Sequence, residues 1–286
     1  MAHAARTDCA LVAFPLLLLQ LFFPCLVFLD RVRLCAVALD VLATLAQVAL
    51  VEKALGLGEF PRVARAAALC IIALLGLLKH NVAATFMAKP MTGEPGSAMH
   101  LHQSVIDLNT GRNIFSNDDG TMSELFMHHI GGLQKYIPEL LPLFAPNVNS
   151  FRRFLPDTSA PVNVEWGEEN RTVGLRVPEA TPQNRRVENR LAGADANPYL
   201  VLAALLTSIE QGLDAKVEPI APLNDDRESG VDFPKDMLDA VRRMQASERV
   251  AAGLGSEFVM VYCENKRQDH LAFMHDISPR EYRWYL

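Results

Sequence analysis

The sequence predicts an α+β fold, in which strands that carry polar side chains are flanked by helices and preceded by a hydrophobic helical segment. Three observations support this prediction. Short runs with period-two alternation, bounded by Gly and Pro, occur after residue 84. Longer runs with apolar residues at helical spacing lie between and after them. Residues 1–78, in contrast, are rich in Leu, Ala and Val and contain only five acidic side chains.

Residues 1–84 are unlike the rest of the chain, so we expect a domain boundary at their end, with a second domain over residues 85–286. The run 9–29 contains Gln20 as its one strongly polar residue and reaches the roughly 20 residues that a membrane-spanning helix needs. Pro15 and Pro24 weaken that interpretation. Three readings stay open with equal weight: a membrane anchor through 9–29, mutually packed helices, or a stretch translated in the wrong frame.

Composition excludes several function classes. The net charge of −6 does not suggest a surface for nucleic acid. Five cysteines without a CxxC argue against a disulfide framework or a structural zinc site. The sequence has no GxxxxGK[ST] loop, no GxGxxG turn and no GxSxG elbow. A nucleotide would therefore be bound by other means, and an anionic small substrate would need a local arginine cluster.

The first predicted elements are two strands and a helix. Residues 83–88 and 97–105 read as strands, separated by a Gly/Pro turn. Thr121 and Glu124 have the spacing of a capping box, and the helix that follows is expected to stop at Pro138.

The later elements are three strands followed by helices. Residues 163–166 and 172–177 read as strands around a polar turn at 167–171, and 186–191 reads as another strand. Asn197 and Pro198 are a favourable N-cap and first helical residue for a helix that continues to about Gly212. After a polar linker, 219–234, further helices are expected with these residues on their apolar faces: Met237, Leu238, Val241 and Met244.

A pair of histidines marks the first cluster with chemical potential. Side chains alternate along a strand, so His100, His102 and Ser104 share one face of the predicted strand 97–105. Two imidazoles and a hydroxyl on one surface suit a metal ion or a nucleotide. Because HxH is a short motif, two half-exposed histidines on a sheet face remain the simpler interpretation.

A row of alternating charges marks the second cluster. Arg186, Glu188 and Arg190 share one face of the predicted strand 186–191. The carboxylate can bind a cation and the two guanidiniums can bind a phosphate. A surface ion-pair ladder is the commoner explanation of a lone RxExR motif.

Further arginines precede this row. Arg171 and Arg176 are five residues apart, which places them on opposite faces of a regular strand. A bulge, or a loop position for Arg171, would be needed to bring both to one site. Together with Arg152 and Arg153, these arginines favour an anionic substrate in an otherwise acidic protein.

Six segments taken together resemble glutamine synthetases in residue type, order and spacing. They are 86–90, 96–102, 149–153, 170–176, 185–190 and 196–200. Each segment alone is modest evidence for the family, but the six segments in this order and at this spacing are specific for it. The resemblance implies that residues 85–286 form the catalytic partial barrel of that family, with antiparallel strands flanked by helices.

The resemblance also implies roles for individual residues. His100 and Glu188 match ligands of one Mg²⁺ or Mn²⁺ that bridges nucleotide phosphates. Arg171 matches the arginine that neutralises the transferred phosphoryl group. Four positions match contacts to ATP: His102, Ser104, Arg176 and Arg186. Three positions match contacts to glutamate: Gly96, Arg153 and Arg190.

The implied activity is an ATP-dependent ligation of glutamate to an amine. In this family ATP and glutamate form γ-glutamyl phosphate, which ammonia or a polyamine then attacks. Positioning and charge stabilisation are what such a phosphoryl transfer requires. The resemblance further implies a cytoplasmic enzyme, for which membrane contact is not typical, and a homo-oligomer with active sites between subunits if the N-terminal domain is intact.

Two departures from the family pattern leave an alternative open. Ser159 occupies the position of a flap glutamate in ordinary glutamine synthetases, which points to relatives that ligate other amines, of the γ-glutamylpolyamine type. The family's N-terminal β-grasp domain and its metal-binding glutamates have no counterpart in residues 1–84. The alternative is an inactive, truncated chain that binds nucleotide or partner subunits, and we expect little or no ligase activity from this chain alone.

Overall fold

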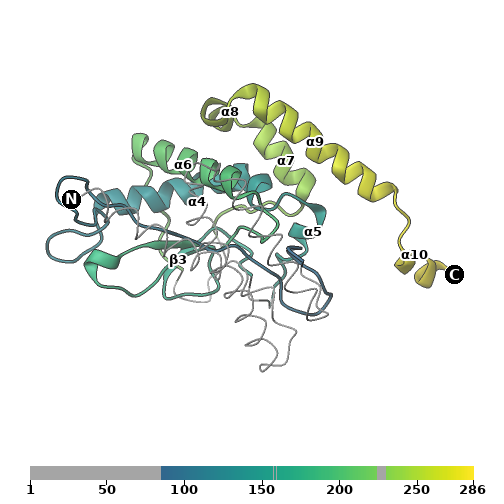
Figure 1. Cartoon of the computed structure of the whole chain (residues 1–286), viewed down its shortest axis with the longest axis horizontal. Helices are drawn as coiled ribbons and strands as arrows, with labels where there is room; N and C mark the ends of the chain where they lie inside the picture. The colour runs from purple at the N-terminus through teal and green to yellow at the C-terminus, as the bar shows by residue number, and fades with distance from the viewer. Residues whose placement is uncertain (1–84, 157, 159, 224–229) are drawn as a thin grey trace, which may run out of the picture. The chain divides into compact units, whose positions relative to one another are not determined.

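The computed structural model describes residues 85–156, 158, 160–223 and 230–286 (Figure 1). The chain divides into two compact units, Met1–Phe86 and Met87–Leu286. The candidate span 9–29 lies outside the described residues. Within the described part, no helix has the length and apolar character needed to cross a membrane.

A small four-stranded sheet carries the polar residues. Its strand order is β1 (Leu101–Gln103), β4 (Val187–Asn189), β3 (Leu175–Val177) and β2 (Trp166–Glu168). Strand β4 runs antiparallel to both β1 and β3, whereas β2 and β3 are parallel.

The register of this sheet fixes the centre of the polar face. Glu188 of β4 lies opposite His102 of β1 and also opposite Arg176 of β3. Side chains opposite one another on neighbouring strands are close enough to interact. The sheet therefore places a carboxylate between an imidazole and a guanidinium.

The strands are shorter than the sequence predicted. The expected strands 97–105, 163–166, 172–177 and 186–191 correspond to strands of three residues each, and residues 85–88 are not a strand. The expected turn 167–171 begins inside β2. Parallel strands usually need a crossover of about a dozen residues, but here residues 169–174 are enough because each strand is short. The positive φ of 50° at Glu169 begins the return.

Helix α4 (Glu124–Phe144) forms much of the core and begins one residue after its cap. The Ser123 hydroxyl accepts a hydrogen bond from the backbone N–H of Phe126 at 3.2 Å. The predicted capping box at Thr121 was wrong, because the Thr121 hydroxyl donates to Asp119 at 2.6 Å and the residue lies before the helix.

The same helix does not stop at Pro138. It continues through Pro138 and Pro142 to Phe144. Each proline removes one helical hydrogen bond, yet Ile137, Leu140 and other residues around them are completely buried, and α4 packs against both α6 and α7. Packing of an apolar face stabilises helices in proteins more than local propensity does, so the tertiary contacts override the local signal.

Helix α6 (Pro198–Asp214) begins where the sequence predicted. The Asn197 side chain accepts from the backbone N–H of Tyr199 at 3.0 Å and of Leu200 at 3.4 Å, and Pro198 is the first helical residue. Helices α4 and α6 approach closely at two glycines: a Cβ atom on Gly132 would lie 2.7 Å from the Cα atom of Gly212.

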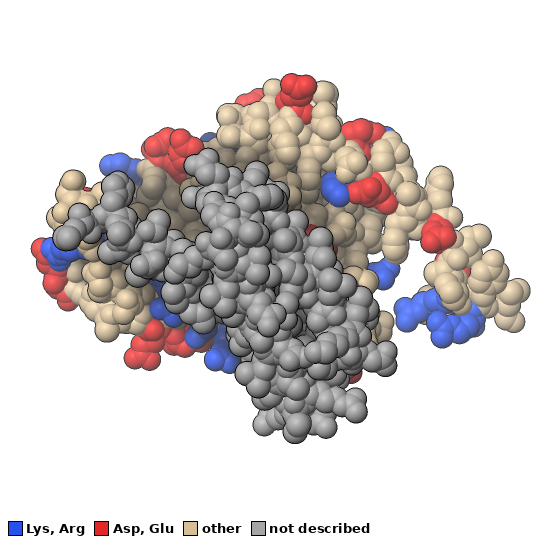
Figure 2. Space-filling model, in the orientation of Figure 1, with Lys and Arg blue, Asp and Glu red and all other residues tan. Residues whose placement is uncertain are grey.

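The remaining helices follow the same α+β plan. They are α5 (Val148–Phe151), the 3-10 helix η2 (Pro182–Asn184), α7 (Met237–Ala246), α8 (Glu248–Leu254), α9 (Ser256–His275) and α10 (Pro279–Tyr285). Of the predicted apolar face of α7, Met237, Val241 and Met244 are buried and Leu238 is half-buried. Figure 1 shows α4 and α6 side by side, with α7, α8 and α9 beyond them. Figure 2 shows acidic and basic side chains interspersed on the face that it views.

Candidate active site

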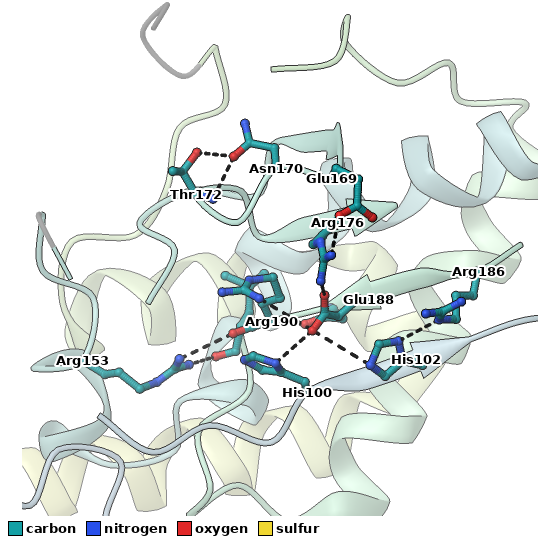
Figure 3. Close-up of polar contacts among 12 residues, drawn as sticks. His100, His102, Arg153, Glu169, Asn170, Thr172, Arg176, Arg186, Glu188 and Arg190 are labelled. Atoms are coloured by element: carbon teal, nitrogen blue, oxygen red, sulfur yellow. Dashed lines mark hydrogen bonds and ion pairs between the residues drawn. The ribbon is translucent and has the colours of Figure 1, made fainter. Parts of the chain in front are cut away.

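Glu188 lies at the centre of the polar face of the sheet (Figure 3). Its Oε1 atom is 3.0 Å from His100 Nδ1, 3.6 Å from Arg190 Nη1 and 3.9 Å from His102 Nε2. Its Oε2 atom accepts from Arg176 Nη1 at 3.1 Å. Only 6% of the Glu188 side chain is exposed, so these four groups are its immediate surroundings.

The electrostatic balance keeps Glu188 ionised. Burial by itself would raise the pKa of this carboxyl, but the hydrogen bond with His100 and the charges of His100, Arg190 and His102 outweigh burial and lower the pKa to about 2. A carboxylate that is charged at neutral pH can bind a cation without first losing a proton.

The two histidines lie on one face, as the period of two predicted. His100, His102 and Ser104 are exposed, whereas the residues that alternate with them are buried or half-buried. The Nε atom of Arg186 donates to His102 Nδ1 at 3.3 Å, which leaves Nε2 as the protonated nitrogen that faces Glu188. Burial lowers the pKa of His102, the charge of Glu188 opposes this, and the charge of Arg186 adds to the lowering.

Arg176 joins Glu188 to a second carboxylate that the sequence analysis missed. Its Nη2 atom donates to Glu169 Oε2 at 2.7 Å, and this hydrogen bond is the main reason that the pKa of Arg176 is raised. The Nε atom of Arg176 is buried and has no hydrogen-bond partner among the described residues. The sequence signal for Glu169 was an acidic side chain within the predicted turn 167–171, two residues before Arg171.

Arg153 and Gly96 meet at the end of β4. Arg153 is 2% exposed, and its guanidinium donates to the backbone carbonyls of Arg190, at 3.4 Å, and of Leu191. Burial lowers the pKa of Arg153 to about 10, partly opposed by the charge of Asp195, so it is protonated at neutral pH. A Cβ atom on Gly96 would lie 2.6 Å from the backbone carbonyl oxygen of Ala88 and 2.7 Å from Arg153 Cγ, so a larger residue here would collide with the backbone.

Arg171 occupies a loop position, which is one of the two alternatives, a bulge or a loop, that the sequence left open. It lies in the segment between β2 and β3 rather than on a regular strand. The pKa of Arg190 is lowered, mainly because the side chain is buried. The charge of Glu188 acts in the opposite direction, and the charges of Arg176 and Arg171 lower this pKa further. Arg171 is thus near enough to Arg190 for their charges to interact, although it would point away on a continuous strand.

Two polar links that support the site were not predicted. Asp195 Oδ2 accepts from Ser150 Oγ at 2.6 Å and from Asn147 Nδ2 at 2.8 Å, which ties the start of α5 to the segment after β4. The Asn149 side chain pairs with the backbone N–H and C=O of Lys89, both at 2.9 Å. These links bring together segments of the chain that the sequence showed only as separate motifs. Ser159 lies outside the described residues.

His100 and Glu188 could bind one divalent cation, but other atoms would have to complete its coordination shell. His100 and Glu188 provide an imidazole nitrogen and a carboxylate oxygen, which are donors that Mg²⁺ or Mn²⁺ accepts. Among the described residues, no group of three or more His, Cys, Asp or Glu side chains is arranged to hold a metal ion. Phosphate oxygens or water would have to complete the coordination. The arginines around Glu188 suit such an anionic ligand.

Comparison with known proteins decides the family. The family model described as glutamine synthetase, catalytic domain, matches residues 77–285. The chain belongs to the glutamine synthetase family.

Several glutamine synthetase family members are similar to this chain. Gamma-glutamylputrescine synthetase PuuA from Escherichia coli (strain K12) is 40% identical over 214 residues, which cover 73% of this chain and 44% of that protein. Glutamine synthetase from Pyrococcus abyssi is 35% identical over 205 residues, which cover 68% of this chain and 46% of that protein. The chain thus spans less than half the length of these curated relatives.

A solved structure also matches. The structure described as apo GmaS without ligand superposes with a TM-score of 0.68 at 26% identity, covering 84% of this chain and 62% of that one. The expected glutamine synthetase-like α+β fold is therefore confirmed, with one parallel strand pair in its sheet.

Proposed function

We propose that this chain carries the catalytic centre of an ATP-dependent ligase that joins the γ-carboxyl group of glutamate to an amine through γ-glutamyl phosphate. The observation that carries the proposal is the position of Glu188, whose two oxygens face two imidazoles and two guanidiniums. A carboxylate ringed by cationic and metal-ligating groups suits a triphosphate with its divalent cation.

The nucleotide would lie over the β1 and β4 side of the sheet. His100 and Glu188 would hold Mg²⁺ or Mn²⁺, and the ion would neutralise phosphate charge when bound. His102 and Arg186, which contact each other at 3.3 Å, would bind the nucleotide together with Ser104 and Arg176. All of these groups lie on or next to strands, which hold side chains more precisely than loops do.

Glutamate would lie at the other end of β4. The guanidiniums of Arg153 and Arg190 would bind its carboxylate, and Gly96 would allow close approach of the backbone. Arg153 is almost completely buried, so its charge is weakly screened and suits a bound anion. Arg171, on the loop before β3, would stabilise the phosphoryl group during transfer.

The proposed chemistry has two steps. An oxygen of the γ-carboxylate attacks the γ-phosphorus of ATP, the bond to the β-phosphate oxygen breaks, and ADP leaves. The amine nitrogen then attacks the acyl carbon of γ-glutamyl phosphate, the bond from that carbon to the phosphate oxygen breaks, inorganic phosphate leaves, and the nitrogen gives up one proton to solvent water. The arginines would lower the barrier of the first step by offsetting charge, and a cation held by His100 and Glu188 would add to this effect when bound.

We propose a polyamine as the first acceptor to test and ammonia as the second. The 40% sequence identity to a gamma-glutamylputrescine synthetase over 214 residues supports this order. We also propose that the enzyme is cytoplasmic and that, if the N-terminal domain is intact, its active form is a homo-oligomer. Gel filtration of the assayed protein would detect the oligomer.

A specific observation favours a second candidate function, a nucleotide-binding chain without turnover. Glu188 is the one carboxylate that faces the proposed metal ligand His100 in the described part of the chain. Each lost metal contact is expected to remove several kcal/mol, on the order of a thousandfold in rate, from transition-state stabilisation.

Phosphate release by the full chain distinguishes these functions. The protein is incubated with ATP, glutamate and Mg²⁺, with putrescine, with ammonium, or without an amine, and Mg·ATP affinity is measured by calorimetry. Amine-dependent phosphate release that Arg171→Ala abolishes supports the ligase. Mg·ATP binding without release supports the second candidate. Absence of both binding and release contradicts both.

A further inference from the structure

The loop of residues 106–122, here called loop 106–122, lies against the segment that leads into β4. Isolated bridges close it at Ile106 with Asn113 and at Ser116 with Met122. None of its residues has a role in the proposed function. Its contacts nevertheless concentrate on residues 181–185, immediately before Arg186.

Loop 106–122 is fixed to the core at one point. Phe115 is completely buried, and its ring centroid lies 4.5 Å from that of Phe126 and 4.9 Å from that of His129, both on α4. The Ser123 hydroxyl donates to the carbonyl of Ile114 at 2.7 Å. These contacts fix the loop relative to α4, so the residues that the loop binds, 181–185, are also fixed relative to α4.

Arg185 is the main contact between the segment and the loop. Its Nη1 atom donates to Ser116 Oγ at 2.9 Å and to the carbonyl of Thr121 at 2.7 Å, and its Nη2 atom donates to the carbonyl of Gly120 at 2.9 Å. The planar fork of guanidinium donors holds several acceptors in one fixed geometry. All three acceptors are neutral, so their role is to place Arg185 rather than to balance its charge.

The loop also holds the backbone of η2 and of the residue that follows it. The buried amide of Asn113 donates through Nδ2 to the carbonyls of Gln183, at 3.0 Å, and of Arg185, at 2.8 Å. Ser116 Oγ donates to the carbonyl of Pro182 at 2.8 Å. A buried amide with both donors used specifies the path of the chain that it binds.

The segment held in this way carries a residue of the nucleotide side of the site. Arg186 follows Arg185 directly, and its Nη1 atom donates to the carbonyl of Asn184 at 3.3 Å within the held segment. Its Nε atom reaches His102 at 3.3 Å (Figure 3). The direction of the Arg186 side chain therefore depends on contacts made by its neighbour.

We propose that Arg185 is a positioning residue that, through loop 106–122, sets the geometry of Arg186 at the nucleotide side of the site. This inference rests on the proposed function. A displacement of Arg186 weakens contacts to nucleotide phosphates, whereas the glutamate-binding Arg153 is held by the carbonyls of Arg190 and Leu191, away from loop 106–122. A selective effect on nucleotide therefore separates positioning from general destabilisation.

The test compares Arg185→Ala and Arg185→Lys with Arg112→Ala in the full chain. Arg112 is the matched control, because it also belongs to this region and carries a guanidinium, but its side chain is 62% exposed and pairs with the exposed Asp118. Calorimetry measures the affinities for Mg·ATP and for glutamate, and hydrogen–deuterium exchange followed by mass spectrometry reports residues 113–122 and 181–187.

Arg185→Ala is expected to weaken Mg·ATP binding by about tenfold, the effect of losing one well-placed ionic contact, and to leave glutamate affinity within about twofold. Exchange over residues 181–187 becomes faster, Arg185→Lys gives an intermediate effect, and Arg112→Ala matches the wild type. Equal losses of affinity for both ligands, or exchange like that of Arg112→Ala, would overturn the proposal. If the wild type binds no Mg·ATP, the proposed function and the nucleotide role of Arg185 are both wrong. Faster exchange over residues 181–187 in Arg185→Ala would then still show that Arg185 holds the segment, and unchanged or slower exchange would show that it does not.

Discussion

The Nδ1 atom of His100 lies 3.0 Å from Glu188 Oε1, although His102 is the residue directly opposite Glu188 in the β1–β4 register and its Nε2 atom lies 3.9 Å away. The diagonal neighbour thus makes the shorter contact. Both imidazoles face the same oxygen, Oε1, and Arg176 binds the other one. This division leaves Oε1 as the oxygen best placed to share a cation with His100.

Replacement of Glu188 should reduce nucleotide binding selectively. We expect Glu188→Ala to weaken Mg·ATP binding by about tenfold or more, because it removes the carboxylate that faces His100. Glu124→Ala is the control, since Glu124 is a 77% exposed carboxylate in the first turn of α4. Calorimetry of both variants measures the effect, and equal affinities would show that the metal assignment is wrong.

The stability of the protein should depend on pH through Glu188. Its pKa is about 2 in the folded chain, below the ordinary value of 4.5, so the ionised form is favoured by folding. The stabilisation is fully present above the ordinary pKa and is lost as the pH falls toward the folded pKa. We expect the melting temperature of wild type to exceed that of Glu188→Gln by about 5 °C at neutral pH. This difference should fall by about half near pH 3. Thermal melts of both proteins across this range would test this, and a constant difference would contradict it.

Asp195 should stabilise the glutamate side of the site. Its carboxylate accepts hydrogen bonds from Ser150 and Asn147, which are distant in sequence. We expect Asp195→Ala to lower the free energy of unfolding by about 2 kcal/mol, because it leaves two donors without an ionic acceptor. Asp119 accepts two bonds from its near neighbour Thr121, so Asp119→Ala should change stability little. Urea denaturation measures both, and similar losses would contradict a special role for Asp195.

The described residues should bind one divalent ion in the presence of nucleotide. His100 and Glu188 face each other, and the described part contains no group of three or more His, Cys, Asp or Glu side chains that could hold a second ion by themselves. We expect titration of the full chain and ATP with Mn²⁺, followed by electron paramagnetic resonance, to give about one tightly bound ion per ATP complex. Two or more ions that Glu188→Ala does not remove would mean that residues outside the described part provide further ligands.

The sequence by itself determined which side chains share a face. The alternation of a strand placed His100, His102 and Ser104 together, and Arg186, Glu188 and Arg190 together. It also placed the start of α6 at Asn197 and Pro198, since an N-cap and a first-turn proline act within a few residues. These properties follow from local backbone geometry, and the structure confirms them.

Only the tertiary structure decided how these faces meet. Strand β4 lies between β1 and β3, which puts Glu188 between His102 and Arg176, and no local pattern specifies which strands become neighbours. Packing against α6 and α7 carried α4 past Pro138, and the short return after β2 put Arg171 on a loop near Arg190. Each outcome depends on contacts between residues far apart in the chain, where burial and long-range pairing outweigh the preferences that a short stretch of sequence expresses.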